Sequence, residues 1–215
     1  MTFKTMAAIG LLAGALCNSA YARPVSYPGG WTSMISNNGS NNAVHIHYSP
    51  TANYSLGVRS QYNRDKEFWF NGVQVNNLIK RWNEPDSQAN FYLKSGAGVT
   101  RSDYGDYDGK TAGTFFTGIA LDWEDRRFFT SYENTYFDAG DIDDHYAQSA
   151  RVGVAPYIGD YGDLHTWMMV LLDHEPEAEH PVTVTPLVRM FKDVHLVEAG
   201  LSNRGEVTLN WVIRY

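Results

Sequence analysis

Glu206-Val-Thr-Leu-Asn-Trp-Val-Ile-Arg-Tyr215 is the stretch that decides the fold of this chain. Along it, apolar or aromatic side chains occupy every second position, beginning at Val207, whereas Thr208 and Arg214 lie among the positions between them. Successive side chains of a strand point to opposite faces, so this period of two predicts a strand with one apolar face. The apolar face ends on an aromatic side chain at Tyr215.

The same alternation recurs along the chain from residue 31 onward. Many of the alternating segments reach ten residues, which is the length that a tilted strand needs to cross a bilayer, whereas strands of soluble proteins typically have about five to six residues. One segment is ambiguous, because 66–82 is either a single bulged strand or two pieces, so ten strands remain an alternative to twelve. The predicted strands lie near 31–37, 43–49, 53–63, 66–82, 89–102, 112–123, 126–138, 145–157, 164–173, 182–191, 194–202 and 206–215.

The last strand resembles the assembly signal of Gram-negative outer-membrane β-barrels, which alternates in the same way and ends on Phe or Tyr. The resemblance implies an all-β, antiparallel up-and-down transmembrane barrel over residues 31–215, located in the outer membrane. It also implies outer-membrane lipid, lipopolysaccharide, the barrel-assembly machinery and periplasmic chaperones as partners. A soluble sandwich would alternate too, but aromatics near strand ends favour the barrel. The residues that carry the predicted insertion signal are Val207, Leu209, Trp211, Ile213 and Tyr215.

The first 22 residues predict a cleaved secretory signal. Lys4 supplies the positive charge, residues 6–16 are apolar or Gly, and Ala20-Tyr21-Ala22 is a small-x-small cleavage site. The apolar run is too short for a helix that spans a membrane, which takes about 20 residues. Residues 23–30 are then a periplasmic lead-in. The one Cys, Cys17, falls in the signal, so the rest of the chain has neither a disulfide nor a Cys-rich zinc site.

Composition narrows the functional classes. Aromatic residues make up 14% of the chain and charged residues only 19%, which excludes a disordered protein. The formal net charge is −7, and this acidic balance argues against a general nucleic-acid binder.

Charged side chains on the predicted strands should point into the lumen, because a Lys or Arg in the lipid midplane costs about 2–4 kcal/mol. Most of them are basic, which predicts a narrow passive pore for small polar or anionic solutes. A closed structural barrel, filled by pairs of Arg and Glu, is the equally weighted alternative. In size and in its Arg-rich lumen, the chain is similar in design to small porins for acidic oligosaccharides, although it matches no family-specific motif. The predicted lumen residues are His45, His47, Arg59, Lys94, Arg127, Glu133, Arg151, Arg189, Glu198 and Arg214.

The predicted outer loops are acidic and contain His. Carboxylates are ligands for Ca²⁺, and His with carboxylates suits Zn²⁺ or Cu²⁺. These loops therefore suggest an outer-face metal-ion or surface-binding barrel as an alternative function. The other interpretation is that they form a solvated surface without a ligand. No other cofactor is expected. The candidate ligands are Asp143, Asp144, His145, His174 and His180.

An enzyme is not expected. Catalysis by a nucleophile needs a base within hydrogen-bond reach. The two candidate groups, His47-Tyr48-Ser49 and Asp143-Asp144-His145, should lie at opposite rims of the barrel, so they cannot combine. No catalytic residue is assigned, and a hydrolase at the outer rim remains the last alternative.

Overall fold

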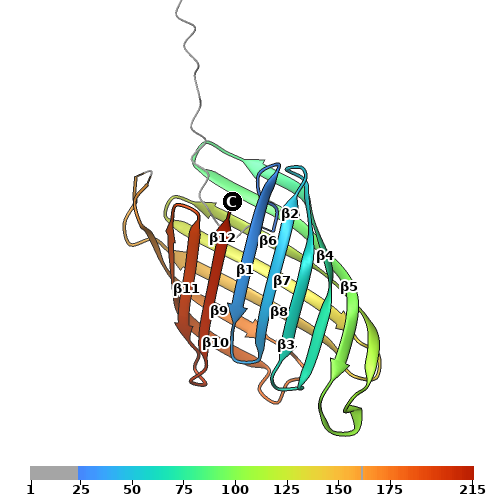
Figure 1. The fold of residues 1–215 in the computed structure, drawn as a ribbon. Coiled ribbons are helices and arrows are strands. Elements are labelled where there is room, and N and C mark those ends of the chain that lie inside the picture. The colour runs from blue at the N-terminus through green and yellow to red at the C-terminus, as the bar shows by residue number, and fades with distance from the viewer. Residues whose placement is uncertain (1–23, 161) are drawn as a thin grey trace, which may run out of the picture.

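Twelve strands form a closed antiparallel ring in the computed structural model, which describes residues 24–160 and 162–215 (Figure 1). Each strand pairs with its neighbours in sequence, and the first pairs with the last. The predicted up-and-down barrel of twelve strands is confirmed, whereas the predicted signal at 1–22 lies outside the described residues. The strands are β1 (Gly30–Asn37), β2 (Asn41–Ser49), β3 (Tyr54–Asn63), β4 (Phe68–Asn83), β5 (Ser87–Ser102), β6 (Thr111–Asp125), β7 (Phe128–Asp138), β8 (Asp144–Val154), β9 (His165–His174), β10 (Val182–Lys192), β11 (His195–Leu201) and β12 (Val207–Arg214).

The two ends of the barrel differ in their connections. We call the end where β1 begins and β12 finishes the terminal end, and the opposite one the loop end (Figure 1). The loop end carries the short 3₁₀ helix Gly105–Tyr107. The terminal end has tight turns, except for residues 155–164, which make the longest connection in the barrel. Within the described part of the chain, no helix is long and apolar enough to cross a bilayer.

The outward face of the barrel is apolar. In β12, Val207 and Leu209 are 60% and 52% exposed, whereas Thr208 between them is 4% exposed. This is the alternation that the sequence predicts for the insertion signal, and Trp211 and Tyr215 are exposed on the same face. Aromatic side chains meet on the outward face near both ends of the barrel. The pairs are Trp31–Tyr48 near the terminal end and Tyr62–Trp69 near the loop end.

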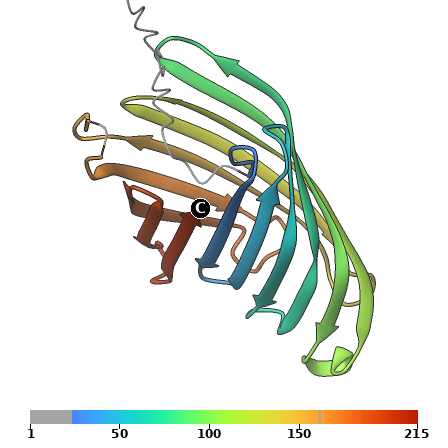
Figure 2. The same ribbon diagram turned by 45° about the horizontal axis from the view of Figure 1, so that its top comes forward.

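The ambiguous segment 66–82 is one strand. β4 continues past a bulge between Leu78 and Lys80, where one extra residue enters the ladder with β5. Such a bulge reverses the face on which the following side chains lie relative to the preceding ones. β4 and β5 have 16 residues each, and together with β6 they form the long side of the barrel (Figure 2).

Two prolines fall near strands that the sequence predicts. Pro156 lies beyond the end of β8, so the predicted strand at 145–157 is slightly too long. Pro186 lies within β10, next to Leu187, where the ladder between β10 and β11 begins. A proline is tolerated at such a point because it removes no hydrogen bond from the middle of the ladder.

Candidate functional site

The lumen is the candidate site, because charged side chains gather there on ten strands. Side chains that pair directly across neighbouring strands share a face, so the buried positions identify which residues point inward. Eleven firmly charged side chains point inward from the strands. They are the basic Arg59, Arg81, Lys94, Arg151, Arg189 and Arg214, and the acidic Asp122, Glu124, Glu133, Asp173 and Glu198.

This set corrects the lumen that the sequence predicts. Arg127 does not line it, because it lies exposed in the turn between β6 and β7. Arg81 takes its place, since the bulge in β4 turns it inward, where its Nε donates to Asn90 Oδ1 at 2.7 Å. The other nine predicted lumen residues occupy inward positions. Among them, the rings of His45 and His47 lie 4.7 Å apart on β2.

Three inward acids were missed by sequence reasoning. Asp173 is the last residue of the predicted strand at 164–173 and belongs to β9, where it shares the inward face with the buried Trp167 and Met169. Asp122 and Glu124 occupy inward positions on β6. The alternation of apolar and polar residues along β6 and β9 is the sequence signal that could have placed these three acids on the inward face. The lumen is therefore mixed in charge and not predominantly basic.

Water has access to the middle of the lumen. Lys94 on β5 and Glu133 on β7 form an ion pair over the intervening β6. The Glu133 side chain is nevertheless 42% exposed, and that of Lys94 is 19% exposed. A charged pair inside a closed barrel can be exposed to this extent only if it borders a space that admits water.

A second charge network is more tightly packed. Glu198 on β11 accepts hydrogen bonds from Arg151 Nη1 at 2.8 Å and from Arg189 Nε at 2.6 Å, and from Asn210 Nδ2 at 2.8 Å. The side chains of Glu198 and Arg189 are both 5% exposed. Since Arg151 comes from β8, the network joins strands that are not neighbours and braces this side of the barrel.

Arg59 differs from the other two central cations, Lys94 and Arg151, in its partners. Its guanidinium donates to the side-chain amide oxygens of Gln61 and Gln74, the latter at 3.3 Å, and lies 5.2 Å from the ring centre of Phe116 on β6. Among the described residues, no carboxylate lies within ion-pair distance of Arg59. The positive charge of Arg59 is therefore available to a solute.

The terminal end is narrowed by the segment that precedes β1. Val25 is 1% exposed and packs with Tyr92 and Ala120, which point inward from β5 and β6. The carbonyl oxygen of Pro24 accepts a hydrogen bond from Ser55 Oγ at 2.6 Å and another from Asn76 Nδ2 at 3.2 Å. Residues 24–30, the described part of the predicted lead-in, thus fill part of this mouth.

An ion-pair cluster joins the connections at the loop end. Lys66 Nζ lies 2.7 Å from Asp143 Oδ1 and 3.3 Å from Glu175 Oε1, while His145 Nδ1 lies 2.7 Å from Asp143 Oδ2. Burial disfavours the charge of Lys66, but the hydrogen bond and charge of Asp143, with Glu175, outweigh it and raise the pKa of Lys66. Burial likewise opposes the charge of Asp143, yet hydrogen bonds to His145 and Lys66 hold its pKa below the usual value.

We expect this cluster to stabilise the barrel over a wide pH range. The lowered pKa of Asp143 gives a stabilisation that is complete above the unfolded-state pKa of about 3.9 and is lost as the pH falls through the folded-state pKa. The raised pKa of Lys66 gives a second stabilisation, which is complete below the unfolded-state pKa of about 10.4 and is lost as the pH rises through the folded-state pKa. The stability difference between the wild type and Asp143→Asn, measured by urea unfolding, should thus be constant at neutral pH and shrink at both extremes.

The matched control for this experiment is Asp141→Asn, because Asp141 is exposed in the same loop. It should differ little from the wild type at any pH. An Asp143→Asn deficit as large at pH 2 as at pH 7 would contradict the assignment.

The structure brings together only two of the five candidate metal ligands, Asp143 and His145. Asp144 points outward and is exposed, His174 Nδ1 lies 2.8 Å from Gln148 Nε2 on the outward face, and His180 is exposed in the connection after β9. Over residues 24–160 and 162–215, no group of three or more His, Cys, Asp or Glu could hold a metal. The metal site therefore stays a prediction.

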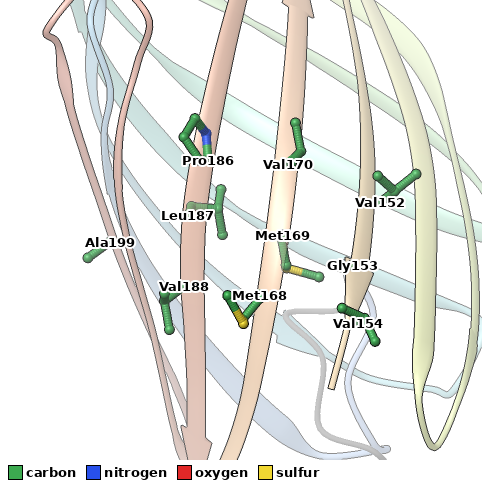
Figure 3. A pocket seen from close by; sticks show the side chains of 10 residues that line it. All are labelled: Val152, Gly153, Val154, Met168, Met169, Val170, Pro186, Leu187, Val188 and Ala199. Carbon is green, nitrogen blue, oxygen red and sulfur yellow. The ribbon is translucent and has the colours of Figure 1, made fainter. Parts of the chain in front are cut away.

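An apolar hollow lies on the outward face of β8–β11 and has a volume of about 610 Å³. Exposed aliphatic side chains, among them Val152, Met168 and Val170, form its walls (Figure 3). A second hollow of about 550 Å³ lies at the loop end beside Lys66 and Tyr104. The first belongs to the apolar exterior, whereas the second is lined mainly by residues of the connections at the loop end.

Two solved structures have a similar fold. One is a "KdgM porin in complex with disordered oligogalacturonate", with a TM-score of 0.50 and 8% identity, and the other is a "KdgM porin", with a TM-score of 0.51 and 9% identity. Each alignment covers 86% of this chain and 98% of the porin chain. At this identity the likeness concerns the fold alone. No family model matches the sequence, and no curated protein does.

Proposed function

We propose that this protein is a narrow passive pore of the outer membrane for small polar solutes, including anions. The observation that carries the proposal is the water-accessible charge in mid-lumen, where the side chain of Glu133 is 42% exposed inside a closed ring of strands. The outward face supports a membrane location, because it is apolar and has aromatic pairs near both ends.

Arg59 favours anions, because it forms no ion pair with a described carboxylate and donates only to neutral side-chain amides. Rings or clusters of Arg and Lys attract anions in pores. The similarity in fold to a porin in complex with oligogalacturonate supports the same direction. In this proposal the protein is a channel and not an enzyme, needs no cofactor, and has outer-membrane lipid, lipopolysaccharide, the assembly machinery and periplasmic chaperones as its partners.

The test is conductance in a planar bilayer. The purified, refolded barrel should give discrete openings in KCl, with anions more permeant than cations. Arg59→Gln should move the reversal potential in a salt gradient toward that of a non-selective pore, because it removes the unpaired charge. Arg127→Gln is the matched control and should leave the reversal potential unchanged, since Arg127 is exposed in a turn.

The absence of any conductance across voltages would reject the pore and favour a closed structural barrel. The tightly packed network around Glu198 and the segment at the terminal end are the features such a barrel would depend on.

A further inference from the structure

The inward charges are divided between two sides of the lumen. The inner surface of β12 and β1–β5, which we call the basic wall, has four basic side chains and no acidic one among its described strand residues. The inner surface of β6–β11, which we call the acidic wall, has five acidic side chains and two basic ones. The basic wall carries Arg59, Arg81, Lys94 and Arg214, and the acidic wall carries Asp122, Glu124, Glu133, Asp173 and Glu198 with Arg151 and Arg189.

Most of these charges have partners. Lys94 pairs with Glu133 where the two walls meet, and Glu198 holds Arg151 and Arg189 within the acidic wall. Arg81 and Asp122 are bridged by Asn90, whose Nδ2 donates to Asp122 Oδ1 at 2.7 Å. Only a small number of the charges on each wall therefore remain able to interact with a passing solute.

Arg59 and Asp173 are the two central charges without a direct ion pair among the described residues, and opposite charges, Glu133 for Arg59 and Arg151 for Asp173, act on them only from a longer distance. Arg59 has no ion pair and donates only to the neutral side-chain amides of Gln61 and Gln74, while the carboxylate of Asp173 has neither an ion pair nor a side-chain hydrogen bond with any described residue. Their strands, β3 and β9, lie opposite one another in the ring, with five strands between them on either side. Both residues lie within electrostatic reach of Glu133, so they belong to the same region of the lumen.

Opposite charges on facing walls of a narrow, weakly screened space produce a field across the pore. A solute with one charge gains from one wall and is repelled by the other. A solute with a positive and a negative group gains from both when it turns to align with the field. We infer that Arg59 and Asp173 select small zwitterions, such as short amino acids, whose carboxylate faces Arg59 and whose ammonium group faces Asp173.

This inference rests on the proposed pore, so the experiment measures both. Liposomes that contain the full barrel are tested for swelling in three solutes of similar size, which are β-alanine (a zwitterion), 3-hydroxypropionate (an anion) and 3-hydroxypropionamide (neutral). The zwitterion should enter fastest, by about threefold or more over the neutral solute. A barrel without KCl conductance would reject the pore itself, whereas a conducting barrel that admits β-alanine no faster than the neutral amide would overturn only the inference.

Two variants separate the roles of the walls. Asp173→Asn should slow β-alanine and speed 3-hydroxypropionate, because it removes the repulsion of anions and the attraction of the ammonium group. Arg59→Gln should slow both. Asp144→Asn, on the exposed outward side of β8, is the control for Asp173 and should change neither rate. KCl conductance shows that each variant has folded, and an Asp173→Asn barrel that conducts with an unchanged β-alanine advantage would refute the assignment.

Discussion

Replacing Glu198 by alanine is expected to lower the free energy of unfolding by about 3–5 kcal/mol, the usual cost of removing one partner from a buried ion pair. Glu198 contacts both Arg151 and Arg189, and its own side chain is 5% exposed. Its loss would leave two guanidinium groups facing one another in a packed region of the lumen. Urea unfolding in detergent, followed by tryptophan fluorescence, measures the effect.

The matched control is Asp103→Ala. Asp103 also pairs with an arginine, Arg101, but at 3.8 Å and with both side chains about half exposed or more. Such surface pairs contribute about 0–1 kcal/mol. A triple variant with Glu198→Leu, Arg151→Met and Arg189→Met should recover much of the lost stability, because no charge is then left alone. An equal effect of Glu198→Ala and Asp103→Ala would show that the network braces nothing.

Val25→Asp is expected to raise single-channel conductance roughly twofold, because pore diameter limits passage and the segment 24–30 occupies the terminal mouth. A buried carboxylate without a partner is costly, and Asp122 and Glu124 on the nearby β6 would repel it. The contacts of Val25 with Tyr92 and Ala120 cannot offset that cost. The segment should therefore leave the mouth while the ring of strands stays intact.

Pro28→Asp places the same charge three residues later at an exposed position, and it should leave the conductance at the wild-type value. Heat-modifiable migration on gels shows whether both variants keep the barrel. If a folded Val25→Asp barrel conducts like the wild type, residues 24–30 do not limit the pore.

The alternation in β12 illustrates why the fold could be predicted from the sequence. A lipid-facing strand must place apolar side chains at every second position, so Val207, Leu209 and Trp211 identify both the strand and its outward face. The constraint is local, because it acts between neighbours two residues apart. The same constraint places Lys94 and Glu133 inward without any knowledge of their partners.

The charge of the lumen could not be predicted to the same extent. The bulge in β4 moves Arg81 from the outward face of the strand to the inward face. Nothing in the local sequence determines which residue is the additional one that forms the bulge. Arg127 is a turn residue because β6 ends at Asp125 and β7 begins at Phe128. The sequence near Arg127 does not determine these ends, because the end of a strand depends on the length of the neighbouring strand. The separation of Arg59 from Asp173 is a property of the closed ring, since residues distant in sequence become opposite only when β1 meets β12.

The seam between β1 and β12 has a kinetic consequence. Trp31 N donates to Tyr215 O at 2.6 Å, and Tyr215 N donates to Trp31 O at 3.0 Å, so the last residue of the chain is part of the ladder. Contacts between residues so far apart in sequence form slowly, because the loop between them must first lose its freedom. Without β12 the sheet has two open edges, and its polar inner face is not enclosed. Removal of even a few residues from β12 should therefore leave the edge strand β1 exposed to aggregation.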